Sequence, residues 1–101
     1  MKFEDFAYLV SDIIMQHTGL STIVLFGRDN DTECTVKLDG KTTSCNLQIE
    51  ITSNILHYWF NNSAQLIFEH HDKETSSQYL WDFIIKPHLK LELLPLLGGA
   101  L

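Results

Sequence analysis

Apolar residues recur at spacings of three and four positions along residues 3–18, which is the period of an amphipathic helix. The apolar stripe begins at Phe3 and extends to His17, while the opposite face is polar. Glu4 falls in the first turn, where the helix dipole favours negative charge. Gly19 follows the last periodic residue and suits the left-handed conformation that ends many helices. The pattern therefore predicts a helix over residues 3–18.

Strand-like patterns follow this helix. Residues 21–28 form a short run rich in β-branched and aromatic side chains, which is typical of a buried strand. Residues 41–51 alternate between apolar and polar side chains, which predicts a strand with one dry face and one wet face. Between residues 32–38 and this strand stands Asp39-Gly40, a dipeptide that favours a two-residue hairpin turn. We therefore predict a hairpin whose turn is Asp39-Gly40.

This hairpin would bring the two cysteines together. If Leu38 and Lys41 flank the turn, Cys34 faces Cys45 at a distance that a disulfide can span. Two reduced thiols packed side by side are the alternative, and a reducing cytosol favours it. The sequence leaves both states open.

The middle of the chain contains one ambiguous stretch. Residues 55–60 are aromatic enough for a strand, yet Ser53 or Asn54 could cap a short helix there. Residues 61–62 are both asparagine, which predicts a turn in either case. Residues 64–70 then predict a further strand.

A second helix is expected towards the C-terminus. Ser76 or Ser77 would cap it, and Pro87 would end it, because the residue before a proline is pushed out of the helical conformation. Three residues are expected to form its core side: Leu80, Phe83 and Ile84. Leucines then alternate with polar residues over 88–93, which predicts a final strand.

Together these elements predict one α+β domain over residues 1–101. We expect an antiparallel sheet of about five strands, with the N-terminal helix and a second, C-terminal helix packed on one face. Hydrophobic residues make up 45% of the chain and charged residues 20%, which suits a globular domain rather than a disordered one. The chain contains no apolar run of about 20 residues, and its first residues are acidic where a secretory signal is basic. A cytoplasmic protein is therefore expected.

The charge balance adds a prediction about partners. Thirteen acidic residues against seven basic ones give a net charge of −6, which repels nucleic acid and anionic membranes and favours a basic protein partner. Two acidic clusters and one aromatic residue are predicted to bind that partner: Asp29, Asp31, Glu33 and Asp39; Glu69, Asp72 and Glu74; and Trp59. Which cluster binds is left open.

Recognisable catalytic and metal-binding patterns are missing from the sequence. The acidic run from Asp29 does not complete a calcium loop, because its sixth position is Cys34 and its twelfth is Gly40. His70 and His71 are adjacent, so on a strand they would point to opposite faces and could not easily share one ion. No glycine-rich phosphate loop and no nucleophile signature is present. We therefore expect neither an enzyme nor a cofactor nor a metal.

Two functions fit these observations, and both involve binding a protein. The first is a small acidic inhibitor: an immunity protein that neutralises a basic toxin nuclease, or a phage-encoded blocker of a nucleic-acid enzyme, in either case by electrostatic complementarity. An enzymatic hypothesis, a small hydrolase or metal enzyme, would require a histidine or carboxylate with a perturbed pKa in a pocket.

The second function follows from a resemblance. The N-terminal helix that ends in Thr18-Gly19-Leu20, followed by the strand-like residues 33–39 and 46–49, resembles the first half of class I type III effector chaperones. The likeness spans residues 3–60 and implies an acidic homodimer that holds an extended effector segment. The chain departs from that pattern after residue 60, because it is short and lacks a middle dimerisation helix.

Overall fold

The computed structural model of the chain describes residues 1–29, 32–41 and 46–90. The first helix, α1, spans Phe3–Thr18, as the apolar repeat predicts. Its inner face carries Phe6, Val10 and Ile14, all fully buried. Gly19 ends the helix with a φ of 72°, a left-handed conformation that a residue without a Cβ adopts at no steric cost. The prediction of this helix and of its last residue is confirmed.

Three strands follow α1 and form one antiparallel sheet in the order β1-β2-β3. Their bounds are β1 Ser21–Phe26, β2 Cys34–Lys41 and β3 Asn46–Ile51. The register places Val24, Val36 and Ile51 side by side across the sheet. Val36 and Ile51 are fully buried, so this row belongs to the inner, core-facing side of the sheet.

The predicted hairpin turn at Asp39-Gly40 is wrong. Strand β2 continues through both residues to Lys41, and Asp39 lies opposite Gln48 in β3. Leu38 lies opposite Ile49, whereas a turn at Asp39-Gly40 would have placed it opposite Lys41. The register that the chain adopts therefore pairs apolar with apolar residues on the inner face, and this outweighs the local preference of the dipeptide.

The cysteine pairing that depended on that turn is not formed by this register. Cys34 lies opposite Phe26 in β1, beyond the last residue pair of β2 and β3. Its side chain is a buried, free thiol, and burial raises the pKa of that thiol because it disfavours the thiolate. Cys45 lies outside the described residues.

The ambiguous stretch after β3 is helical. Helix α2 (Ser53–Trp59) runs without a break into a π-helical turn, η1 (Phe60–Ala64), and then into α3 (Gln65–His70). The helical alternative for residues 55–60 is therefore correct, and the strand predicted over 64–70 is wrong. Asn62 makes no turn; its side-chain amide donates a hydrogen bond of 3.0 Å to the carbonyl of Tyr58 within the helix.

A second long helical stretch begins earlier than expected. Helix α4 spans Lys73–Tyr79, and its N-cap is Asp72, whose carboxylate accepts a 2.7 Å hydrogen bond from the N–H of Thr75. Ser76, one of the two predicted caps, is instead fully buried within the first turns of this helix. Its hydroxyl donates a hydrogen bond of 3.3 Å to the carbonyl of Ile67 and so links α4 to α3.

The helix then passes through a second π-helical turn, η2 (Leu80–Ile85), and remains helical over residues 86–90. The π turn sets the spacing of buried residues: Leu80, Ile85 and Leu89 are buried, at intervals of five and four. Phe83, expected in the core, is 65% exposed. The prediction that Pro87 ends the helix is wrong, because residues 86–90 are helical. A π-helical turn comes directly before the proline, and such turns are places where a helix departs from its regular hydrogen bonding.

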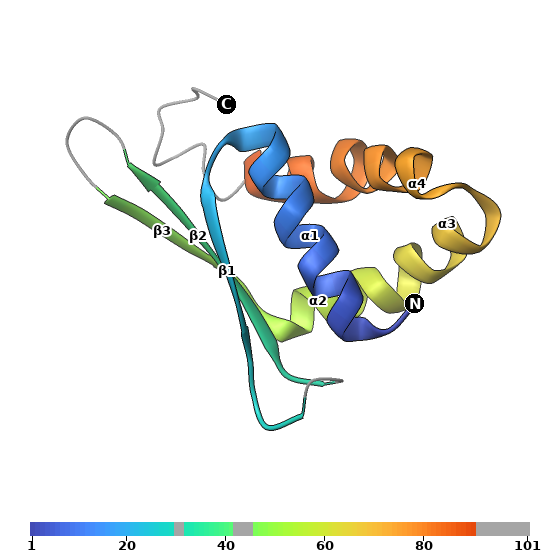
Figure 1. Ribbon diagram of the computed structural model, residues 1–101, viewed down its shortest axis with the longest axis horizontal. Helices are drawn as coiled ribbons and strands as arrows, with labels where there is room; N and C mark the ends of the chain where they lie inside the picture. The colour runs from blue at the N-terminus through green and yellow to red at the C-terminus, as the bar shows by residue number, and fades with distance from the viewer. Residues whose placement is uncertain (30–31, 42–45, 91–101) are drawn as a thin grey trace.

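The chain is an α+β protein, as predicted, but its sheet has three strands among the described residues rather than about five. Residues 88–90 of the predicted final strand are helical, and residues 91–93 lie outside the described ranges. Figure 1 shows the helices on one side of the sheet, where α1 packs against β1 and β2. The core lies between these two layers, and the described helices leave the other face of the sheet uncovered.

Candidate functional site

Strand β1 presents apolar side chains on the uncovered face of the sheet. Ile23 is 56% exposed and Leu25 is 46% exposed, although both belong to a regular strand. On the neighbouring strand Lys37 lies opposite Ile23, and its ammonium group forms an ion pair of 3.5 Å with Glu50 of β3. The outer face of the sheet is therefore apolar along β1 and charged along β2 and β3.

Among the described strands, β1 is also an edge strand, with outward-facing backbone groups. The N–H of Gly27 donates a 3.0 Å hydrogen bond to the carbonyl of Glu33, just beyond the end of the strand. In an antiparallel pair the residues alternate between bonding to the partner strand and facing away from it. Gly27 bonds to the partner strand, so the residues one, three and five positions before it face the open edge with both their N–H and C=O groups. These residues are Phe26, Val24 and Thr22.

Helix α1 borders this open edge on the inner side. The rings of Tyr8 and Phe26 lie 5.4 Å apart, and the sulfur of Met15 lies 3.9 Å from the Thr22 hydroxyl. Tyr8 is 49% exposed and Met15 is 45% exposed. A hydrogen bond of 2.5 Å from the hydroxyl of Ser11 to that of Thr22 fixes α1 against the strand.

The open edge and the exposed apolar side chains on its two sides together form what we call the β1 edge surface. It consists of the open backbone edge of Ser21–Phe26 and four exposed apolar side chains: Tyr8, Met15, Ile23 and Leu25. An unpaired edge flanked by exposed apolar side chains is a template for pairing with another extended chain.

Acidic residues of the first predicted cluster lie at the two ends of β1. Asp29 and Glu33 belong to the turn that follows the strand, and the Glu33 carboxylate accepts a 3.2 Å hydrogen bond from the N–H of Arg28. Asp39 lies opposite Ser21, where the strand begins. Asp39 stands six positions after Glu33 along extended chain, a distance of about 20 Å. Asp31 lies outside the described residues.

The second predicted cluster lies elsewhere. Glu69, Asp72 and Glu74 are exposed around the connection between α3 and α4, at the opposite side of the helical layer from the sheet (Figure 1). Hydrogen bonds from Thr75, above all from its backbone N–H, lower the pKa of Asp72. That carboxylate already caps α4, so it has a structural role. The fold does not bring the two acidic clusters together into one negative surface.

Trp59 is not part of an exposed patch, contrary to prediction. It is only 7% exposed, and its ring lies 5.5 Å from that of His88 in an edge-on arrangement. The helical conformation of α2 turns Trp59 to the same side as the fully buried Leu56, whereas Tyr58 points outward and is 65% exposed. Trp59 therefore offers little surface to a binding partner.

The exposure of Ile23 and Leu25 does not follow from the sequence pattern, because residues 21–28 are apolar on both faces, as in a strand buried on both sides. One signal for an exposed face was nevertheless present, because both predicted helices were expected on the same face of the sheet. A sheet covered on one face leaves half of β1 exposed.

In the described part of the chain, no three histidine, cysteine or acidic residues are arranged so that they could hold a metal ion. His70 and His71 are exposed at the end of α3. His57 stacks on Phe3 with 3.7 Å between ring centroids, and its Nε2 atom is buried without a hydrogen-bond partner among the described residues. Within the described ranges, no helix is both long and apolar enough to cross a membrane.

Compared with protein-family models, with curated proteins and with solved structures, the chain has no significant match. The function therefore has to be argued from the geometry itself, and the β1 edge surface is the feature with the clearest chemical meaning: it offers hydrogen-bonding groups and apolar contacts to an extended chain.

Proposed function

We propose that this chain is a non-enzymatic protein-binding protein, and that it holds an extended, basic segment of a partner along the β1 edge surface. The observation that carries this proposal is the exposure of Ile23 and Leu25 beside a strand edge that no described strand covers.

The backbone of β1 supplies the first part of the interaction. A partner segment that adds to the sheet pairs its N–H and C=O groups with those of Thr22, Val24 and Phe26. Its side chains then alternate between the two faces. Those on the outer face lie against Ile23 and Leu25, and burial of these apolar side chains adds about 25 cal/mol for each Å² removed from water.

Charge supplies the second part. The protein carries a net charge of −6, and carboxylates stand at both ends of β1: Asp29 and Glu33 at one end, Asp39 at the other. This arrangement suits a segment with lysine or arginine about six positions apart, matching the spacing of about 20 Å. Negative charge also speeds the approach of a basic partner, an effect that falls with salt.

Two biological roles agree with such binding. A chaperone for an exported or unfolded protein holds an extended segment, and the open strand edge supports this role. An inhibitor of a basic toxin nuclease or other nucleic-acid enzyme is the second candidate, supported by the net charge of −6. We place the chaperone-type role first, because the acidic clusters lie apart and an edge strand takes extended rather than folded chain.

The test uses a peptide of alternating valine and threonine with lysine at both ends as the probe. Its affinity is measured by fluorescence polarisation against the wild-type chain and the double variant Ile23→Thr and Leu25→Thr. Threonine keeps the β-propensity and adds no charge. We expect binding to the wild type and an affinity about tenfold lower for the variant, since each side chain loses methyl or methylene contacts worth about 0.8 kcal/mol.

A matched control removes two exposed apolar side chains far from β1. Tyr58 and Leu66 are 65% and 57% exposed on the helical stretch that follows β3, so Tyr58→Gln with Leu66→Gln should bind the peptide as the wild type does. Equal affinity of the β1 variant and the wild type, or no binding by the wild type, would disprove the proposal. A partner captured only in its folded state would favour the inhibitor role over the chaperone role.

A further inference from the structure

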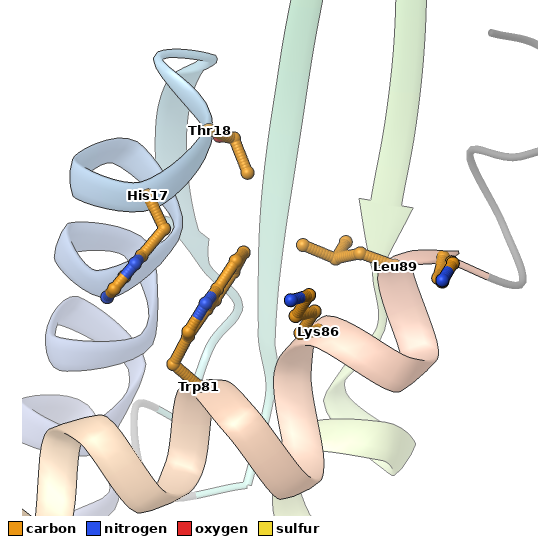
Figure 2. A pocket seen from close by; sticks show the side chains of 6 residues that line it. His17, Thr18, Trp81, Lys86 and Leu89 are labelled. Atoms are coloured by element: carbon orange, nitrogen blue, oxygen red, sulfur yellow. The ribbon is translucent and has the colours of Figure 1, made fainter. Parts of the chain in front are cut away.

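A pocket of about 260 Å³ lies between the end of α1 and the helical stretch that includes η2 and residues 86–90 (Figure 2). The described residues that line it are His17, Thr18, Trp81, Lys86, Leu89 and Lys90. None of them belongs to the β1 edge surface, so the pocket is a separate feature. Its size is close to the lower limit of small-molecule pockets and suits a small ligand rather than a polypeptide.

The wall of this pocket is aromatic and held in place. The indole of Trp81 is only 8% exposed, and it stacks on the imidazole of His17 with 4.4 Å between centroids and 8° between planes. Figure 2 shows the indole between His17 on one side and Lys86 with Leu89 on the other. One face of Trp81 is thus occupied by His17, and the small part of the ring that remains exposed lines the pocket, where an apolar group can contact it.

The rim of the pocket carries positive charge. Lys86 and Lys90 are one helical turn apart, both are exposed, and both line the pocket. Like charges at this spacing repel each other and destabilise a helix. No described carboxylate forms an ion pair with either ammonium group. Asp82, one turn before Lys86, instead accepts a hydrogen bond of 3.1 Å from the amide of Gln78.

The two ammonium groups also outweigh the partial negative charge at the end of α1. His17 and Thr18 belong to the last turn of α1, whose carbonyl groups carry a partial negative charge of about half a unit. Two full positive charges exceed it. On a protein with a net charge of −6, two of the seven lysine and arginine residues therefore stand together over an aromatic wall. This combination selects for an anion that also has an apolar part.

We propose that the pocket binds a small organic anion, in which a carboxylate or phosphate is attached to a flat apolar body. The anionic group lies between the ammonium groups of Lys86 and Lys90, and the flat body enters the pocket and contacts the exposed part of Trp81. This site does not depend on the proposed function of the β1 edge surface.

Three probes separate the two parts of this recognition. They are 2-naphthoate, which has the charge and the flat body; 2-naphthamide, which has the body without the charge; and acetate, which has the charge without the body. Their affinities for the full chain are measured by calorimetry, with tryptophan fluorescence as a second readout. We expect 2-naphthoate to bind at least tenfold more tightly than either of the others. Equal affinities of 2-naphthoate and 2-naphthamide would overturn the proposal, whatever the variants do.

Variants then locate the site. Lys86→Gln with Lys90→Gln should lower the affinity for 2-naphthoate about tenfold and leave that for 2-naphthamide unchanged. Lys2→Gln with Lys73→Gln is the matched control, because both lysines are exposed and the net charge changes equally. Its affinity for 2-naphthoate should equal that of the wild type. An equal loss in both double variants would show a general effect of net charge and would also overturn the proposal. Circular dichroism checks that all variants are folded.

Discussion

A substitution at His57 would test how the N-terminal end of α1 packs against α2. The His57 ring stacks on Phe3, with 3.7 Å between centroids and 9° between planes, and its Nε2 atom is buried with no described hydrogen-bond partner. A buried polar atom without a partner costs about 1–3 kcal/mol. Phenylalanine has a ring of similar shape and no polar atom. The substitution His57→Phe should therefore keep the stack on Phe3 and stabilise the protein.

The expected gain is about 1 kcal/mol, at the lower end of that range, because the His57 side chain is only half-buried and the phenylalanine ring is larger. For a domain of about 100 residues, 1 kcal/mol corresponds to a rise of about 4–8 °C in the midpoint of thermal unfolding. Thermal unfolding followed by circular dichroism measures this rise directly, and urea unfolding gives the free energy independently.

The control for this prediction is His71→Phe. His71 is exposed at the end of α3, so this substitution should change the free energy of unfolding by no more than about 0.5 kcal/mol. A lower unfolding midpoint for His57→Phe beside an unchanged His71→Phe would refute the reasoning. It would mean that Nε2 has a stabilising partner, such as an ordered water molecule, that phenylalanine removes.

Two further predictions concern the second helical stretch. Hydrogen bonds from Thr75 lower the pKa of Asp72, so its contribution to stability is present above the ordinary carboxyl pKa and lost as the pH falls through the lowered, folded-state value. In urea unfolding, the difference in stability between the wild type and Asp72→Ala should therefore shrink from about pH 6 to about pH 2; a constant difference would contradict the capping role. Phe83 is 65% exposed, so Phe83→Gln should lower the free energy of unfolding by no more than about 0.5 kcal/mol, as measured by urea unfolding. A loss of several kcal/mol would show that Phe83 is part of the core.

The candidate site could be predicted only in part. The acidic residues were visible in the sequence, and Asp29 follows the end of β1 directly. Asp39 was predicted in a turn, and only the register of β1 and β2 places it opposite Ser21. Both helices were expected on one face of the sheet, so an exposed face of β1 followed from the prediction, but which residues lie on it did not. Both faces of the strand are apolar, and only the positions of the helices decide that Ile23 and Leu25 are exposed. The pocket beside Trp81 joins residues more than sixty positions apart and has no local signal.

The sequence by itself determined the features that depend on neighbours along the chain. Helix α1 follows from the three- and four-residue spacing of its apolar side chains, and its last residue follows from Gly19, whose freedom at positive φ is a property of glycine alone. The α+β class and the excess of negative charge were likewise determined by local pattern and composition.

The tertiary structure decided the features that depend on distant contacts. Local preference favoured a turn at Asp39-Gly40, but pairing Leu38 with Ile49 buries more apolar surface, and burial outweighs a dipeptide preference. Residues 64–70 suit a strand in isolation, yet they are helical because the stretch from Ser53 is one continuous helix that directs Leu56, Trp59 and Ala64 into the core. Short apolar runs fit either conformation, so the surface that they pack against makes the choice.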